Sequence, residues 1–437
     1  MSVSLSLFAG VGQQFFDNSG IPLAGGLIYT YEAGTSTPAT TYTSASGVTP
    51  QTNPIVLDAA GRVPSGEIWL TSGLNYKFVL KTSVGITIAT YDNVPSSLIL
   101  SDTISAIETI LATSTGSSLV GNTASGTGAI ATTVQSKLRE SVSVKDFGAV
   151  GNGTTDDTTA FTNALNSGAL KIIAPSGSYL IDTISIPSKV TLDLTGATLL
   201  FKAHTTSHNP MIRIGTLANS VSNAKILNGT LIGNSASQTY SAEEWSPGIF
   251  IWGANYNSVI GTTITDCKGD GITIGYDTGR VVGANANTVK DCLIYGNLAI
   301  RQAISITYGN ENLITSNRCS GTIDLEINAS TGECKNNIVT NNTGIVQAEN
   351  LAIPRISSLV IFVGTLNTNL TLTQGNIISN NNCASISLQY TSNTLVIGNT
   401  IIGSLASQVR LIDLSGAPNT SIAVSYTHLT LPTNREV

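Results

Sequence analysis

Two acidic side chains on one predicted strand are the residues of this sequence best suited to chemistry. The segment TIDLEIN holds Asp324 and Glu326 two positions apart, so both face the same side of a strand. Asp270 and Arg301 stand at the start of two earlier segments with the same alternation. Hydrolysis of a glycosidic bond needs one acid that protonates the leaving oxygen and one carboxylate that activates water, about 6.5 to 9.5 Å apart for inversion. These four residues are the candidate catalytic set.

A second candidate group is aromatic. The chain is only 6% aromatic, yet the segment YSAEEWSPGIFIWGANY concentrates such rings beside two acids. Flat apolar faces with polar edges suit sugar rings, and exposed aromatics on a repeating surface mark binding sites. The predicted substrate-binding residues are Trp245, Phe250, Trp252, Tyr256, Glu243 and Glu244. Packing of a loop or a contact between chains is the alternative for the rings, and either glutamate is an alternative acid.

The elements that must position these side chains are short alternating strands: GIFIWG, GITIGY, AISITYG, TIDLEIN and ASISLQY. Period two sends one set of residues to the interior, namely Ile249, Ile251, Ile272, Ile274, Ile304, Ile306, Ile323, Leu325, Ile327, Ile386 and Leu388. The intervening residues then face outward, namely Phe250, Trp252, Thr273, Ser305, Thr307, Asp324 and Glu326. If the strands stack about 4.8 Å apart, these side chains form one exposed wall, with the aromatic residues on an earlier coil and the acidic residues on a later one.

This stacking sets the spacing of the candidate acids. Asp270 and Asp324 are expected to lie two coils apart, roughly 10 Å, and their side chains can shorten that gap. A surface ion pair between Arg301 and the acids is the competing interpretation, since such pairs are common and weak.

A second repeat predicts the stacking itself. An asparagine turn followed by a short β-branched run recurs as NSVIG, NTVKD, NLITSN, NIVTNN, NIISNN and TLVIGN. This recurrence is typical of a β-solenoid, in which each coil buries its apolar side against the next. The asparagine side chains can form a hydrogen-bonded ladder along the turns. The five cysteines fall within these repeats without CxxC spacing, which favours reduced thiols in the stacked core.

The start of the repeat is marked by SVKDFGAVGNGTTDDTTAFTNAL, residues 143–165. This segment resembles the first segment of the pectate-lyase-like superfamily of right-handed parallel β-helices. Its glycines supply a tight turn, and the helix that follows is expected to cover the open end of the solenoid. Asp156 and Asp157 are interpreted as caps of that helix and not as a catalytic dyad. The resemblance implies a parallel β-helix over residues 141–423.

Residues 1–95 predict a different structure. Alternation in Leu27 to Tyr31 and in Tyr76 to Leu80 favours half-buried antiparallel strands separated by turns. Through GGLIY, AGT, NPIVLD, AG and YDNV, the segment resembles the virion-anchoring, head-binding domain of bacteriophage tailspikes. The resemblance implies that phage tail or head-connector proteins are its partners. An ordinary β-sandwich with another role is the alternative.

Residues 96–140 form a connector rich in Ser, Thr, Gly and Ala. Ile104, Ile107 and Ile110 or Leu111 make an apolar stripe at helical spacing, which can pair with copies of itself in a short coiled coil. Tailspikes are trimers, so the resemblance implies a homotrimer whose chains meet along this neck. A solitary amphipathic helix lying on its own domain is the alternative.

The final stretch, VSYTHLTLPT, does not read as natural protein sequence. It looks like the in-frame translation of a transposase sequencing adapter. Residues 424–437 are therefore expected to be an artefact, and the natural β-helix is expected to continue beyond Ala423. The fold class predicted for the whole chain is all-β: a right-handed parallel β-helix preceded by a small antiparallel β domain and a short helical neck.

Composition and motifs argue against several functions. A net charge of −6 provides no basic surface for nucleic acid, and no apolar run is long enough for membrane insertion. The N-terminus lacks the features of a signal peptide, which predicts no export by the general secretory route. His204 and His208 precede a helix-breaking proline and no acid is expected close by, so neither a metal nor another cofactor is expected. The NTD, DD, HG and RIK elements of polygalacturonases are missing after Gly168, so pectin is not implied as the substrate.

The function implied by the resemblances of residues 1–95 and 143–165 is that of a phage tailspike. The chain would be made in the host cytoplasm, assemble into the virion and act at the bacterial cell surface. There it would bind bacterial surface polysaccharide, capsule or O-antigen, and depolymerise it by hydrolysis with the groove carboxylates. Two alternatives stay open: a non-catalytic receptor-binding or structural fibre, and a lyase in which Arg301 with a Lys or Tyr abstracts a proton from a uronic acid.

Overall fold

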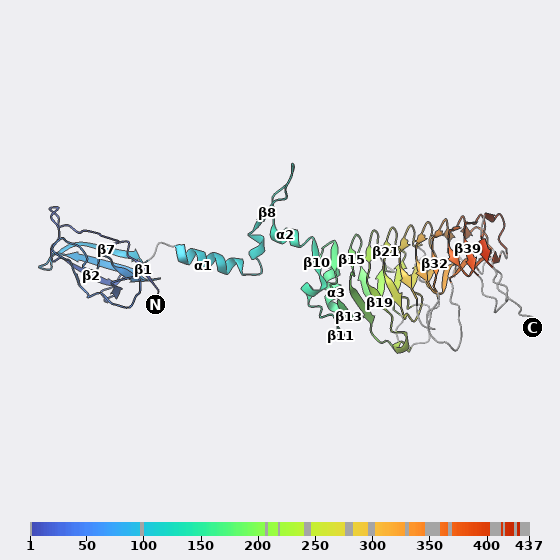
Figure 1. Cartoon of the computed structure of the whole chain (residues 1–437), viewed down its shortest axis with the longest axis horizontal. Helices are drawn as coiled ribbons and strands as arrows, with labels where there is room; N and C mark the ends of the chain where they lie inside the picture. The colour runs from blue at the N-terminus through green and yellow to red at the C-terminus, as the bar shows by residue number, and fades with distance from the viewer. Residues whose placement is uncertain are drawn as a thin grey trace, which may run out of the picture. The chain divides into compact units, whose positions relative to one another are not determined.

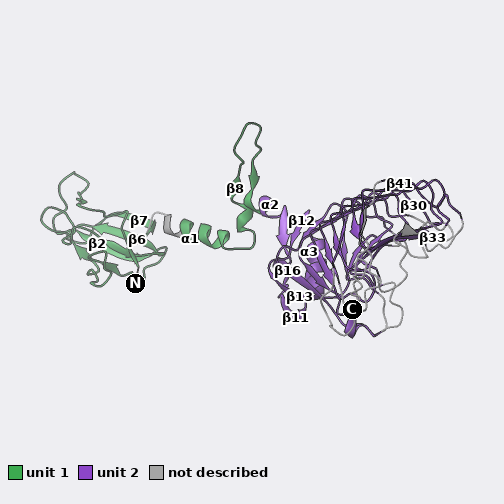
Figure 2. Cartoon of the chain, turned by 45° about the vertical axis from the view of Figure 1, so that its right-hand side comes forward, with its two compact units in different colours: residues 1–135 green, residues 136–437 purple. Residues whose placement is uncertain are grey.

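The computed structural model of the chain contains two compact units, residues 1–135 and 136–437 (Figure 2). It describes residues 2–96, 100–205, 209–216, 219–239, 246–275, 283–295, 302–327, 332–345, 359–365, 369–402, 412–413, 416–423 and 426–428. Among these residues, no helix combines the length and the apolar character needed to cross a bilayer.

Unit 1 is built on two antiparallel sheets. The first has the order β1-β5-β3 and the second the order β4-β2-β6-β7. Their strands are β1 (Val3–Leu5), β2 (Leu27–Glu32), β3 (Thr41–Tyr42), β4 (Ile55–Val56), β5 (Trp69–Thr71), β6 (Asn75–Lys81) and β7 (Thr87–Pro95). Alternate residues of β2 and β6 are buried, including Ile28 and Phe78. The predicted antiparallel strands are therefore confirmed.

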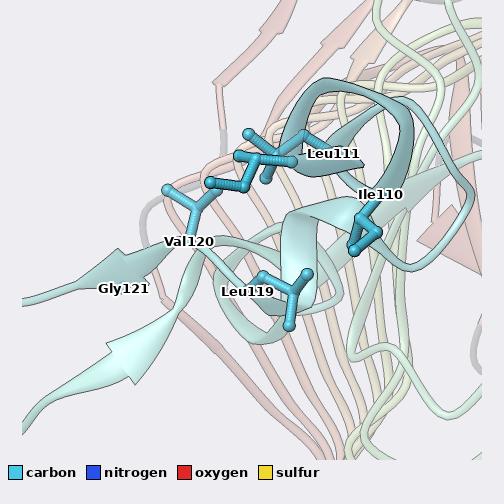
Figure 3. A pocket seen from close by; sticks show the side chains of 6 residues that line it. Ile110, Leu111, Leu119, Val120 and Gly121 are labelled. Atoms are coloured by element: carbon cyan, nitrogen blue, oxygen red, sulfur yellow. The ribbon is translucent and has the colours of Figure 1, made fainter. Parts of the chain in front are cut away.

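The neck segment of unit 1 begins with helix α1 (Leu100–Leu111), which carries the predicted apolar stripe. Its large apolar side chains are about half exposed, at 46–50%: Ile104, Ile107, Ile110 and Leu111. The short helix η1 (Gly116–Ser118) and the hairpin of β8 (Gly121–Asn122) and β9 (Thr132–Thr133) follow. A pocket lies between α1 and the start of this hairpin, lined by Ile107, Ile110, Leu111, Leu119, Val120 and Gly121 (Figure 3).

Unit 2 is a parallel β-helix, as predicted. Three parallel sheets of eleven, eleven and nine strands run through its described residues, and successive coils add one strand to each sheet (Figure 1). The first sheet contains β10 (Ser141–Ser143), β12 (Lys171–Ile173), β15 (Thr191–Asp193), β18 (Lys225–Leu227), β21 (Ser258–Ile260), β24 (Thr288–Lys290), β27 (Leu313–Thr315), β31 (Ile338–Thr340), β35 (Ile377–Ser379), β38 (Leu395–Ile397) and β41 (Ser421–Ala423).

The second sheet has the same number of strands. It contains β11 (Asn152–Asp156), β13 (Gly177–Ile181), β16 (Ala197–Phe201), β19 (Thr230–Ile232), β22 (Thr263–Thr265), β25 (Leu293–Ile294), β28 (Arg318–Cys319), β32 (Thr343–Gly344), β36 (Asn382–Cys383), β39 (Thr400–Ile402) and β42 (Tyr426–His428). β42, which falls in the stretch interpreted as an adapter, pairs in parallel with β39.

The nine-stranded sheet positions the candidate site. It contains β14 (Ile184–Ile186), β17 (Ile212–Ile214), β20 (Ile249–Trp252), β23 (Ile272–Gly275), β26 (Ile304–Ile306), β29 (Thr322–Ile327), β33 (Val360–Thr365), β37 (Ser385–Gln389) and β40 (Ile412–Asp413). All the isoleucines and leucines predicted to face inward from this sheet are at most 3% exposed and join one continuous core. The period-two interpretation of these strands is confirmed.

Asparagine ladders lock the coils in register. In the main ladder the Oδ1 atom of each asparagine accepts hydrogen bonds from the backbone N–H and the Nδ2 atom of its counterpart in the preceding coil, at 2.9–3.2 Å. Its members are Asn257, Asn287, Asn312, Asn337 and Asn376, all fully buried. A second ladder joins Asn317, Asn342, Asn381 and Asn399. The predicted ladder is confirmed, and there are two such buried ladders among the described residues.

The first coil is covered by helix α3 (Thr158–Leu165), as predicted, because Phe161 and Leu165 pack into the solenoid core. The capping interpretation is right for one acid only. Asp156 accepts the Thr158 N–H at 3.1 Å, but the Asp157 side chain makes no cap hydrogen bond. Asp157 is buried and instead accepts the N–H groups of Val150 and Gly151 at 2.7 and 3.0 Å. These bonds give the N–H groups of the turn a partner, which regular strand pairing does not provide there.

Gly151 shows why this turn requires glycine. Its φ is +70°, and a Cβ atom there would lie 2.8 Å from Cε1 of the Tyr179 ring. Any larger residue would therefore be strained in its backbone and would also push the ring out of the first coil.

An ion pair beside this turn should make the first coils sensitive to acid. Lys202 Nζ lies 2.7 Å from Asp156 Oδ2, and this hydrogen bond, with that from Thr158, lowers the pKa of Asp156 from 3.8 to about 2. The pair stabilises the fold above pH 3.8, and the stabilisation is lost as the pH falls toward 2. Because the Asp156 side chain is 48% exposed, solvent limits the contribution to about 1 kcal/mol or less.

We therefore expect Asp156→Asn to lower the free energy of unfolding by up to about 1 kcal/mol at pH 7 and to have a much smaller effect at pH 2. Urea unfolding of both proteins at the two pH values measures this difference. A destabilisation of equal size at pH 2 would show that the ion pair is not its cause.

The cysteines have the environment predicted from the sequence, whereas His204 does not. All five cysteines are buried and unpaired, as expected, and burial raises the pKa of the Cys267 thiol to about 12. The expectation that no acid lies near His204 is wrong: its Nε2 lies 3.3 Å from Asp182 Oδ1. The two residues are distant in sequence but lie on neighbouring coils, where parallel stacking brings them side by side. The described residues include no group of three or more potential metal ligands; His208 lies outside them.

Candidate functional site

The outward-facing side chains of the nine-stranded sheet form two columns, which together we call the wall. Strand register aligns the first column as Arg213, Phe250, Thr273, Ser305, Asp324, Phe362 and Ser387. In the second column Trp252 is aligned with Gly275, and Glu326 with Gly364 and Gln389. The structure therefore brings the predicted outward residues onto one face, as the alternation indicated.

The wall is far less exposed than predicted. Phe250 is 4% exposed, Trp252 8% and Asp324 5%, whereas we expected an open aromatic and acidic surface. The two rings also pack on each other: Phe250 and Trp252 stack with centroids 5.5 Å apart and an interplanar angle of 8°. The Arg213 guanidinium lies 5.3 Å from the Trp252 ring centre. The alternation showed which way these side chains point, but not how much neighbouring groups cover them.

A hydrogen-bond network joins two of the predicted catalytic acids. Asp270, which precedes β23, accepts hydrogen bonds from the hydroxyls of Ser305 at 2.6 Å and Thr273 at 3.2 Å. It also accepts the backbone N–H of Gln302 at 3.2 Å. The side chain of the same Gln302 donates from Nε2 to Asp324 Oδ2 at 2.8 Å. Asp270 and Asp324 are therefore held in one unit through Gln302, although two coils separate them.

Glu326 lies at the more open edge of this network. It is half-buried and makes no hydrogen bond or ion pair with the residues that the structure describes. Because Asp324 and Glu326 are two positions apart on β29, their Cα atoms are about 6.6 Å apart. Their two carboxyl groups, one hydrogen-bonded and one not, are suited to different roles.

The remaining predicted residues are distributed as follows. Tyr256 is 66% exposed and lies in the turn between β20 and β21, away from the wall strands. Its φ of +61° and its backbone N–H bond to Asn285 show that it belongs to the asparagine-rich turn. The predictions for Arg301, Trp245, Glu243 and Glu244 fall outside the described residues.

Four residues on or beside the wall were not identified from the sequence: Gln302, Phe362, Gly364 and Arg213. The signal for Phe362 was present, since VIFVGT alternates as the other wall strands do. Arg213 stands in the alternating segment MIRIG. Gln302 carries no such signal, because its importance comes from contacts with residues of two other coils.

The arrangement can support acid–base chemistry. A carboxylate that accepts hydrogen bonds is favoured in its charged form, which is the form of a general base. The site contains no cysteine or histidine among its described residues, so nucleophilic chemistry of the thiol or imidazole kind has no candidate there.

Comparison with known proteins gives similarities in fold and one short match in sequence. No family model matches the chain. YobO, a protein of Bacillus subtilis (strain 168) whose name describes it as phage-related, is 44% identical over 57 residues. This match covers 13% of the present chain and 7% of YobO, so the chain spans a small part of that relative.

Two solved structures of viral proteins resemble the chain over most of its length. A mutant tailspike protein of E. coli bacteriophage HK620, solved in complex with a pentasaccharide, is 14% identical and aligns with a TM-score of 0.46 over 75% of this chain and 70% of the tailspike. The protein ORF18 of Geobacillus virus E2 is 13% identical, with a TM-score of 0.46 over 80% of this chain and 68% of that protein.

Proposed function

We propose that the chain binds a bacterial surface polysaccharide on the wall and hydrolyses it, in the manner of a phage tailspike. The observation that carries this proposal is the joined set of Asp270, Gln302 and Asp324, with Glu326 on the same face of the same strand. Residues 143–165 resemble a segment of β-helix proteins, and residues 1–95 resemble a head-binding domain. These resemblances support capsule or O-antigen at the bacterial cell surface as the polysaccharide.

The four residues receive different roles. Asp324, which accepts the Gln302 amide, acts as the base that takes a proton from water. The water oxygen bonds to the anomeric carbon as the glycosidic C–O bond breaks, and Glu326 gives its proton to the leaving oxygen. Asp270 accepts the backbone N–H of Gln302 and so keeps the Gln302 side-chain amide in position to donate to Asp324. Arg301, which precedes Gln302 in sequence, remains a predicted member of the site.

An assay with purified capsular and O-antigen polysaccharides separates this proposal from the two alternatives. Hydrolysis releases reducing ends and creates no unsaturated sugar, whereas a lyase produces both reducing ends and absorbance from unsaturated products. A chain that binds a polysaccharide but yields neither signal is an adhesion fibre. We expect reducing ends without unsaturation, and inversion at the anomeric carbon of the product.

For unit 1 we propose the role of a virion anchor that binds phage tail or head-connector proteins. This role would place the chain in the virion, with unit 2 available for the cell surface. The proposal is supported by the sequence resemblance of residues 1–95, together with the antiparallel strands β2 and β6 where the alternation predicted them.

We further propose that three chains associate through α1. A helix of 12 residues is marginal in water without tertiary packing, and the apolar stripe of α1 is half exposed. Copies of the same stripe can cover one another in a coiled coil. The pocket shown in Figure 3 lies beside this stripe and would be covered at the same time.

The expected mass in solution is three times the chain mass of 45.2 kDa, measured by light scattering after size-exclusion chromatography. Ile107→Lys would place a charge in the middle of the stripe and should give single chains. Ile130→Lys, at a position that is 85% exposed in the hairpin loop, should leave the trimer unchanged. A wild-type protein that elutes as a single chain would contradict the proposal.

A further inference from the structure

A glycine on the wall shapes the surface beside the candidate acids. Gly364 of β33 is aligned with Glu326 of β29, and Phe362 is aligned with Asp324. A Cβ atom at position 364 would lie 2.7 Å from Cζ and 3.0 Å from Cε1 of the Phe362 ring. The ring therefore extends over the glycine, along the strand and toward the column of Glu326.

Phe362 differs from Phe250 and Trp252, the other wall aromatics, in being partly accessible. Phe250 and Trp252 are nearly fully buried and stack on each other, and Arg213 covers the Trp252 ring. Phe362 is only partly buried, and it has no ring contact or cation contact with the residues that the structure describes. Part of the Phe362 side chain is thus accessible, unlike those of Phe250 and Trp252.

The charges around the Phe362 ring indicate which class of sugar it can bind. The wall positions directly beside Phe362 on its own strand and on β37 are uncharged: Gly364, Ser387 and Gln389. The ionisable groups next to it, Asp324 and Glu326, are acids, and the carboxylate of Asp324 would repel an anionic sugar. An apolar ring face with polar groups at its edge suits the C–H face of a neutral pyranose.

We propose that Phe362 is the platform on which a neutral pyranose ring of the polysaccharide stacks. The platform lies one coil, about 4.8 Å, from Asp324, so a sugar bound there directs its glycosidic bond toward the carboxylates. Gly364 is part of the platform because its missing side chain lets the ring lie across the strand. This inference rests on the proposed function and adds the residue that positions the substrate and the class of sugar it holds.

The test uses the full-length chain with Asp324→Asn, which retains the Gln302 contact but should not consume its ligand. Purified capsular and O-antigen polysaccharides are the probes, and titration calorimetry measures their binding. Adding Phe362→Ala should weaken binding about tenfold, and Phe362→Trp should restore it. Gly364→Ala should also weaken binding because its Cβ displaces the ring. Ile397→Ala, which removes an exposed apolar side chain from the first sheet, is the matched control.

Each outcome has one meaning once circular dichroism has shown that the variants keep the wild-type spectrum and melting temperature. Binding that stays within twofold of the parent in Phe362→Ala overturns the platform, while cleavage by the wild-type chain would still support the proposed function. Binding restricted to polysaccharides built entirely from acidic sugars overturns the neutral-sugar assignment. A wild-type chain that binds none of the probes overturns the proposed function and this inference with it.

Discussion

Asp324→Asn should lower the rate of reducing-end release by about 10² to 10⁴, the usual effect of removing a general base. The substitution keeps an oxygen that can accept the Gln302 Nε2 hydrogen bond, so the wall should keep its structure. Glu326→Gln should cause a loss of similar size because it removes the proton donor. Initial rates on the polysaccharide that the wild-type chain degrades measure both effects, with the substrate at saturating concentration.

The loss should be confined to the wall acids. Asp291→Asn is a suitable control, since Asp291 is an exposed acid in the turn between β24 and β25 and pairs with Lys290 at 3.5 Å. This control should retain the wild-type rate. Unchanged turnover in both Asp324→Asn and Glu326→Gln would remove the wall acids from the mechanism.

Asn312→Ala should be among the most destabilising single changes in unit 2. The Asn312 side chain accepts from the backbone N–H and Nδ2 of Asn287 at 2.9 and 3.1 Å and donates to the Ala284 carbonyl at 3.0 Å. The Asn287 N–H and the Ala284 carbonyl would lose their partner inside the fold. Asn287 Nδ2 and Asn337 Oδ1 would each lose one of two partners. At about 1 to 3 kcal/mol for each buried unsatisfied group, the expected loss is about 3 to 5 kcal/mol. Urea unfolding followed by circular dichroism measures the loss.

Asn310→Ala is the control that distinguishes the effect of losing ladder hydrogen bonds from the effect of losing any asparagine side chain. Asn310 lies in the same coil, is only partly buried, and its oxygen accepts one short bond from the Lys335 N–H, at 2.8 Å. We expect a loss of about 1 kcal/mol for this variant. Equal losses at positions 310 and 312 would contradict the view that the buried ladder carries the stability of the turns.

Much of the fold could be predicted because its repeats are local in sequence. Asn312 and Asn337 precede the same kind of β run, and only a stacked solenoid lets both occupy equivalent turns. The inward isoleucines followed from the period of two, which depends on strand geometry and not on distant contacts. The helix over the first coil likewise followed from a dense local motif.

The candidate site was predicted only in outline. Sequence placed Asp324 and Glu326 on one face, but the contact of Gln302 with both acids depends on how three coils align. The burial of Phe250 and Trp252 depends on Arg213 and on ring stacking, which no alternation pattern reports. Asp157 was misassigned for a similar reason: its partners lie in the preceding turn and not in the helix it precedes.

The central claim is that the wall of the nine-stranded sheet is where the polysaccharide is bound and cut. A crystal structure of Asp324→Asn/Glu326→Gln with an oligosaccharide cut from the degraded polymer tests it most directly. We predict density for the sugar along β29 and β33, with one pyranose on Phe362 and a glycosidic oxygen within hydrogen-bond reach of residue 326. A saccharide bound only to the outer faces of the two eleven-stranded sheets, with the wall empty, would contradict the claim.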